Sequence, residues 1–84
     1  MFKTLSSPGH RALVKAMIAA RKSAGITQTE LAKLLRCQQS LIARMESGQR
    51  RIDAVDIVRW ARAVGADPRA FIDAVVENSD DLRD

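Results

Sequence analysis

The stretch from Gln28 to Arg51, QTELAKLLRCQQSLIARMESGQRR, contains two short amphipathic patterns joined by LRCQ, a segment without glycine or proline. Thr27 stands directly before the first pattern, and Glu30 follows three residues later. This spacing predicts a capping box, in which each side chain accepts a hydrogen bond from the other residue's backbone N–H. We therefore expect one helix over residues 28–35 and a second that begins at residue 38 or 39 and ends at 46.

Each of these two helices has an apolar face that we expect to be buried. The expected buried residues are Leu31, Leu34 and Leu35 in the first helix and Leu41, Ile42 and Met45 in the second. Ala32 is small enough to let the two helix axes cross closely, and two helices joined by so short a turn form a helix-turn-helix. When its apolar face is buried, the second helix exposes Gln39, Ser40 and Arg44.

The three exposed side chains match the hydrogen-bonding groups of base edges in the DNA major groove. A Gln side chain can bond adenine N6 and N7, an Arg side chain can bond guanine O6 and N7, and Ser is permissive. We interpret Gln39, Ser40 and Arg44 as base-reading residues. The alternative interpretation is a solvated helix face without a ligand.

Phosphate-binding residues are expected near both ends of this helix pair. Gln28 opens the first helix, where backbone N–H groups and the positive helix end can hold a phosphate. Arg50 and Arg51 follow the second helix and can reach neighbouring phosphates. Lys33 and Arg36 are further candidates for phosphate contact, with a solvated surface role as the alternative for each.

The rest of the chain also has helical periodicity, which predicts an all-α fold. We expect further helices from about residue 8 to 24, over residues 54–64, and from about residue 68 onward. Each of them is preceded by a residue that suits an N-cap, namely Ser7, Asp53 and Asp67. We expect one domain over residues 1–84, with its core at about 8–76 and an acidic tail at 77–84.

Three residue types that occur once each need an interpretation. Trp60 lies on an apolar helical stripe, so we expect it in the core rather than as a platform for bases. The single histidine, His10, is interpreted as a surface or capping residue, and the single cysteine, Cys37, as a packing residue in the turn. One Cys and one His offer no metal-ligand set, and no nucleophile is paired with a base. The sequence therefore predicts no metal, no cofactor and no enzyme activity.

The charge of the chain is unevenly distributed. Residues 1–52 carry ten Lys and Arg residues, including Lys3, against two acids, a net charge of +8, and residues 53–84 carry four against eight, a net charge of −4. A basic front half suggests a polyanionic partner, although an unevenly charged surface is the alternative. Of the two acids, Glu30 serves the capping box, and we expect Glu46 to pair with a nearby arginine. No apolar run approaches the ~18 residues of a membrane span, and with a lone cysteine this predicts a cytoplasmic protein without a membrane partner.

The run GITQTELAKLLRCQQSLIARMESGQRR resembles the Cro/C1-type helix-turn-helix domain, also called the XRE family, and the resemblance covers about residues 11–76. Its most specific parts are TQTELA, QQS-I-R-E-G and RAVGADPRAF. The resemblance implies a compact bundle of four or five helices, of the lambda-repressor-like type. By position, it puts the phosphate clamp on Gln28 and base readout on Gln39, Ser40 and Arg44, with Gln38 nearby. Many family members have glycine at Arg36, valine at Cys37 and proline at Ile52.

The resemblance implies a transcriptional regulator that binds double-stranded DNA, usually as a homodimer on two half-sites. We expect a repressor whose helix at about 38–46 reads the major groove of its operator. The candidate dimer surface consists of Phe71, Ile72, Val75 and Val76, with closure of the core as the alternative role. The alternative function is an antitoxin that binds a toxin and represses its own operon, and a third is a scaffold that does not bind DNA.

Overall fold

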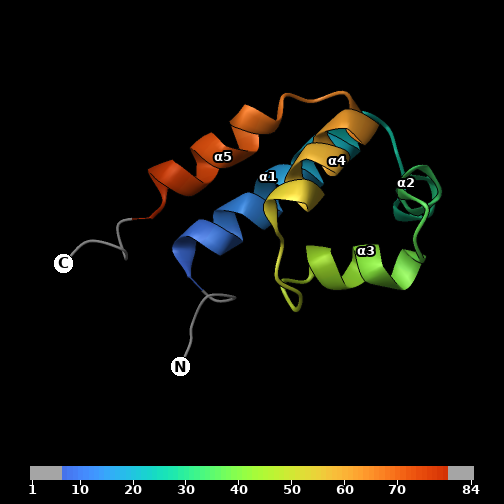
Figure 1. The fold of residues 1–84 in the computed structure, drawn as a ribbon, viewed down its shortest axis with the longest axis horizontal. Helices are drawn as coiled ribbons and strands as arrows, with labels where there is room; N and C mark the ends of the chain where they lie inside the picture. Colours follow the sequence, from blue (N-terminus) through green and yellow to red (C-terminus); the bar gives the residue numbers. More distant parts are fainter. Residues whose placement is uncertain (1–6, 80–84) are drawn as a thin grey trace.

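The computed structural model describes residues 7–79, and this part of the chain contains five α-helices and no strand (Figure 1). The helices are α1 (Pro8–Ser23), α2 (Gln28–Leu35), α3 (Gln39–Glu46), α4 (Ala54–Val64) and α5 (Pro68–Glu77). The predicted all-α class is confirmed, and the predicted helix bounds agree to within about one residue. Lys3 and residues 80–84 of the predicted acidic tail lie outside the described residues.

Local side-chain hydrogen bonds explain where the helices begin. Thr27 Oγ1 accepts from the Glu30 N–H at 3.1 Å, and the Thr27 N–H donates to Glu30 Oε1 at 2.9 Å, so the predicted capping box is present. The carboxylate of Glu30 is hydrogen-bonded by the Thr27 backbone N–H and then by the Thr27 side chain, which favours its ionised form and lowers the pKa of Glu30. Asp53 caps α4 as predicted, and Asp56 completes a second capping box that the sequence analysis did not anticipate.

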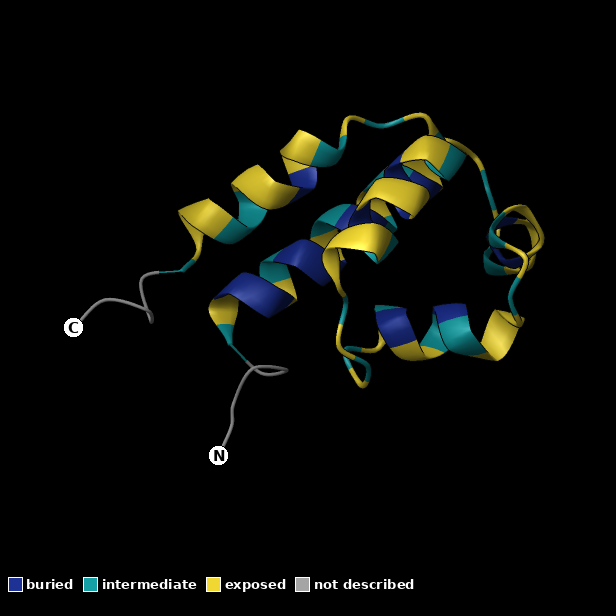
Figure 2. Ribbon diagram, viewed as in Figure 1, coloured by how far each residue is buried: buried dark blue, intermediate teal, exposed yellow. Residues whose placement is uncertain are grey.

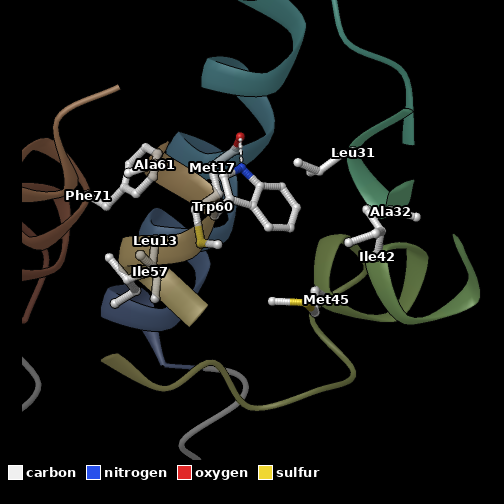
Figure 3. Close-up of a cluster of buried hydrophobic side chains, with 10 residues drawn as sticks. All are labelled: Leu13, Met17, Leu31, Ala32, Ile42, Met45, Ile57, Trp60, Ala61 and Phe71. Atoms are coloured by element: carbon white, nitrogen blue, oxygen red, sulfur yellow. Dashed lines mark hydrogen bonds between the residues drawn. The ribbon is translucent and has the colours of Figure 1, made fainter. Parts of the chain in front are cut away.

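Trp60 of α4 lies at the centre of the hydrophobic core, as its place in the helical stripe predicts (Figure 3). Its Nε1–H donates to the backbone carbonyl of Met17 at 3.0 Å, which satisfies the one polar group of the buried indole. Leu31 of α2 and Ile42 of α3 are fully buried in the same cluster. The helix-turn-helix is therefore held on α1 and α4 by one shared apolar core.

Helix α5 returns alongside α1 in the opposite direction, so that the two described ends of the chain lie on the same side of the molecule (Figure 1). The helices approach closely at Gly9, where an added Cβ would lie 2.7 Å from Ser79 Oγ. Figure 2 shows the buried residues on the inner faces of α1 and α4 and the exposed residues on the outer face of α5. Within α5, Phe71 is the residue that enters the core.

Two predictions about burial, for Leu34 and His10, are wrong, and for Phe71 the alternative role of closing the core holds. Leu34 was expected in the core but is 57% exposed. The buried arc of α2 runs through Leu31, Leu35 and Ala32, and at about 100° per residue Leu34 lies roughly 110° from the centre of that arc. Phe71 is buried with 2% exposure, so it closes the core and is not available for a dimer surface. His10 is buried rather than at the surface, because it lies one turn before Leu13 on the core-facing stripe of α1.

Candidate nucleic-acid interface

The turn between α2 and α3 is built around Arg36. This residue has φ 56° and ψ 47°, and it is the one residue other than glycine with a positive φ in residues 7–79. The Cys37 N–H donates to the Ala32 carbonyl at 3.0 Å and the Arg36 N–H to the Lys33 carbonyl at 3.2 Å, which is a Schellman motif. A left-handed backbone costs a residue with a side chain roughly 1 kcal/mol. Cys37 packs against the core, in agreement with the packing role expected for it.

Helix α3 lies across the core with Ile42 and Met45 buried beneath it, while Leu41 is partly buried at its edge. This orientation leaves Gln38, Gln39, Ser40 and Arg44 exposed, as the interpretation of α3 as a reading helix requires. Gln38 precedes the first turn as the N-cap residue and makes no side-chain hydrogen bond to the helix end. Its side chain therefore leaves the N–H groups at the start of α3 uncapped.

A chain of hydrogen bonds connects the interior of the protein to the exposed end of α3. Arg21 of α1 donates through Nε and Nη2 to the two carboxylate oxygens of Glu46, at 2.6 and 3.0 Å. Gln28 Nε2 donates to Glu46 Oε1 at 2.9 Å, and Gln39 Nε2 donates to Gln28 Oε1 at 2.7 Å. We call these four residues the Arg21–Gln39 chain. The hydrogen bond to Gln28 orients the side-chain amide of Gln39. The amide oxygen and the second amide hydrogen of Gln39 make no hydrogen bond within the Arg21–Gln39 chain.

The inner end of the Arg21–Gln39 chain is a buried ion pair. The side chains of Arg21 and Glu46 are 10% and 8% exposed, and Arg21 Nη1 also donates to the Ile26 carbonyl at 2.8 Å. The carboxylate accepts from three donors, so the charge of each partner is compensated in the low-dielectric interior. The arginine partner expected for Glu46 is therefore Arg21, which the sequence analysis counted only as part of the basic front half.

The expected phosphate-binding residues differ in how far they are engaged. Lys33, Arg36 and Arg51 are exposed, and Gln28 is partly buried because it belongs to the Arg21–Gln39 chain. Arg50 Nη1 donates to Asp56 Oδ2 at 3.1 Å and to the Arg51 carbonyl at 3.0 Å. Arg50 therefore braces the loop before α4, and only part of its side chain remains accessible to a ligand.

Arg21 could have been found from the sequence. It lies four residues after Met17 and eleven after His10, on the same buried stripe of α1 as Leu13. A charged residue on a core-facing stripe demands a buried partner. Which acid provides that partner is a tertiary contact across 25 positions, and local spacing carries no signal for it.

Within residues 7–79, no three His, Cys, Asp or Glu side chains are grouped so that they could hold a metal ion. The helices of the same part of the chain include none with the length and apolar character needed to cross a membrane.

Comparison with known proteins agrees with this geometry. Residues 17–72, which include the turn and α3, match a family model described as a helix-turn-helix domain. The structure resembles an XRE-family like protein from Pseudomonas syringae pv. tomato str. DC3000, with 35% identity over 89% of this chain and 92% of that chain and a TM-score of 0.79. It also resembles the clp gene regulator ClgR from C. glutamicum at 21% identity, over 83% of this chain and 90% of that one, with a TM-score of 0.73, which concerns the fold alone. A comparison with curated proteins found no match.

The fold and the turn thus define a helix-turn-helix protein. On the family match and the 35% identical relative, the chain belongs to the XRE family. Membership of this family supports a DNA-binding transcription regulator as the class of protein.

Proposed function

We propose that this protein is a sequence-specific repressor that binds double-stranded DNA and inserts α3 into the major groove. The observation that carries the proposal is the Arg21–Gln39 chain, which holds an exposed amide at the start of α3 through a buried ion pair. Orienting a side chain before the ligand arrives reduces the entropy lost on binding. A solvated helix face would not need such an anchor.

The exposed residues divide into roles by their chemistry. The free amide oxygen and amide hydrogen of Gln39 suit adenine N6 and N7, and the guanidinium of Arg44 suits guanine O6 and N7. Ser40 and Gln38 lie beside them and can accept or donate at neighbouring base pairs. Gln28, Lys33, Arg36 and Arg51 would contact phosphates, which determine register rather than sequence.

Helix α5 offers a surface through which two copies can pair. Ile72 and Val76 are 44% and 68% exposed, one turn apart on the outer side of α5. Val75 packs partly against the core and can contribute only its exposed edge. Pairing through this surface would place two reading helices on successive major grooves, ~34 Å apart, on a pseudo-palindromic operator.

The proposal is tested by selecting bound sequences from a random pool of double-stranded DNA with the full chain at a stated salt concentration. We expect enrichment of two half-sites whose centres are about 10–10.5 base pairs apart. The Arg44→Ala variant, whose side chain is exposed and lies outside the Arg21–Gln39 chain, is the matched control and should lose enrichment at one position of each half-site. If a folded chain enriches no sequence above the input pool, the proposed function is wrong.

A further inference from the structure

A cavity of about 380 Å³ lies between the first half of α1 and the end of α3. Arg11 and Lys15 of α1 line one side, and Ser47 and Gly48, directly after α3, line the other. A cavity of this volume falls within the roughly 300–1,000 Å³ typical of sites for small organic ligands. It does not include any residue to which we assign base or phosphate contacts.

The lining combines positive charge with apolar surface. Arg11 and Lys15 are separated by one helical turn, so their cationic groups extend from the same face of α1. Val14 and Ile18 supply apolar surface beside them. Glu46 is the one acid in the lining, and its carboxylate already accepts from Arg21 and Gln28. The net character therefore favours an anionic head group attached to an apolar body.

His10 forms part of the buried wall of the cavity. This residue lines the cavity and is 9% exposed, and its Nε2 atom is buried without a hydrogen-bond partner among residues 7–79. Because Nε2 has almost no accessible surface of its own, a ligand in the cavity would touch other atoms of His10. Burial, and then the nearby charge of Arg51, lower the pKa of His10.

The cavity adjoins the residue that anchors the reading face. Glu46 is both part of the lining and the acceptor at the inner end of the Arg21–Gln39 chain. A ligand that contacts Glu46 or displaces Ser47 therefore acts on the position of Gln28, and through it on Gln39. Binding at the two sites would be thermodynamically linked, because both depend on the same side chain.

We propose that this cavity binds a small organic anion, a carboxylate or phosphate monoester with an apolar body, and that its occupancy changes the affinity for DNA. The anion lies at Lys15 and Arg11, and the apolar body lies against Val14 and Ile18. The apolar lining favours such a molecule over a phosphodiester of the DNA backbone, which has no apolar body to bury. Only the effect on DNA affinity rests on the proposed function.

The test is a titration of the full chain, without DNA, followed through backbone amide chemical shifts. The probes are phenyl phosphate and benzoate, with inorganic phosphate carrying the head group alone and benzyl alcohol the apolar body alone. We expect saturable shifts at His10, Ser47 and Gly48 for phenyl phosphate or benzoate and weaker binding of the two partial probes. Lys15→Met should weaken binding about tenfold by removing one charged contact. Lys22→Met, on the same helix but outside the cavity, should leave binding unchanged.

The outcomes separate this inference from the proposed function. If no probe produces saturable shifts, or if Lys22→Met weakens binding as much as Lys15→Met, the ligand site is wrong. Weaker DNA binding by Lys15→Met without binding of any probe would mean that the cavity meets backbone phosphate, which also overturns the inference. Binding of phenyl phosphate by a chain that enriches no DNA sequence would support the site and overturn the proposed function.

Discussion

At the scale of single residues, Arg44 is the exposed side chain that most directly tests the reading face. Replacing it with Ala removes the bidentate base contact that we propose for it, and we expect a loss of about 1–3 kcal/mol in specific affinity together with relaxed preference at that position. Anisotropy titrations with the selected operator and with a scrambled duplex measure both effects. Equal affinity of the variant and the parent chain for the operator would exclude Arg44 from base readout.

Through the Arg21–Gln39 chain, Glu46 should affect both the stability of the fold and the proposed recognition of DNA. Glu46→Ala leaves the Arg21 guanidinium buried without its partner, and the free energy of unfolding should fall by about 3–5 kcal/mol. The control is Arg50→Ala, which breaks the Arg50–Asp56 pair. The Arg50 side chain is 37% exposed, so this loss should stay near 0–1 kcal/mol, as for surface pairs.

Urea denaturation of the two variants decides this point. Similar losses in both would mean that burial of the Arg21–Glu46 pair has no energetic consequence. Where enough folded Glu46→Ala protein remains, its specific DNA affinity should also fall, because Gln28 and Gln39 lose their anchor.

Because Arg36 has a left-handed backbone and a positive charge, two substitutions at this position can distinguish the effect of backbone strain from the effect of charge. Arg36→Gly removes the steric cost of the turn and should raise the free energy of unfolding by about 0.5–1 kcal/mol. Arg36→Ala keeps the strain and should bring no such gain. Both variants remove a cation next to α3, so both should weaken binding to all DNA sequences alike. Urea denaturation measures the change in stability, and titration with non-specific DNA measures the change in affinity. Unchanged DNA affinity in both variants would leave Arg36 a turn residue only.

At the scale of secondary-structure elements, the capping box of α2 gives a pH-dependent contribution to stability. The pKa of Glu30 is lowered in the folded chain from its ordinary value of 4.5, because its carboxylate is hydrogen-bonded by the Thr27 backbone N–H and then by the Thr27 side chain. A lowered folded-state pKa means that the stabilisation is present above about pH 4.5 and is lost as the pH falls through the folded-state value.

Thermal unfolding measured between pH 3 and 7 tests this contribution of Glu30. Glu30→Gln keeps a side chain that can accept from the Thr27 N–H but cannot titrate, so its melting temperature should fall less on acidification than that of the parent chain. Parallel pH curves for the two proteins would exclude a contribution from the Glu30 carboxylate.

The elements were largely predictable from the sequence because their signals are local. The Thr27–Glu30 spacing and the N-cap residues Ser7, Asp53 and Asp67 each stand within three residues of the helix start that they mark, and the helix bounds agree with them. Leu34 was misplaced because a short amphipathic pattern does not say on which side of the apolar stripe the neighbouring helices pack.

The interior of the site was not predictable in the same way. Arg21 and Glu46 are 25 residues apart, and Arg59 donates to the Leu35 carbonyl across 24. Contacts of this kind depend on how α1, α2, α3 and α4 are arranged around Trp60, which no local pattern specifies. The exposure of Gln39, Ser40 and Arg44 on α3, by contrast, follows from one buried face of a single helix.

At the scale of the whole molecule, we propose that a second copy attaches at α5. Replacing both Ile72 and Val76 with Gln should leave the fold intact, since both are exposed, but should shift sedimentation from dimer to monomer. Affinity for a two-half-site operator should then fall, while affinity for one half-site stays the same. Leu34→Gln, which changes an equally exposed leucine on α2, is the matched control and should sediment as the parent does.

The Arg21–Gln39 chain also bears on how new DNA specificities could arise in this protein. Gln39 shares its anchor with the buried ion pair, so substitutions there disturb a network on which folding also depends. Arg44 and Ser40 lie on the same face outside that network. Evolution or engineering of altered operator preference should therefore proceed first through positions 40 and 44, which can vary with little loss of stability. Position 39 should keep a Gln side chain, because its amide is part of the Arg21–Gln39 chain.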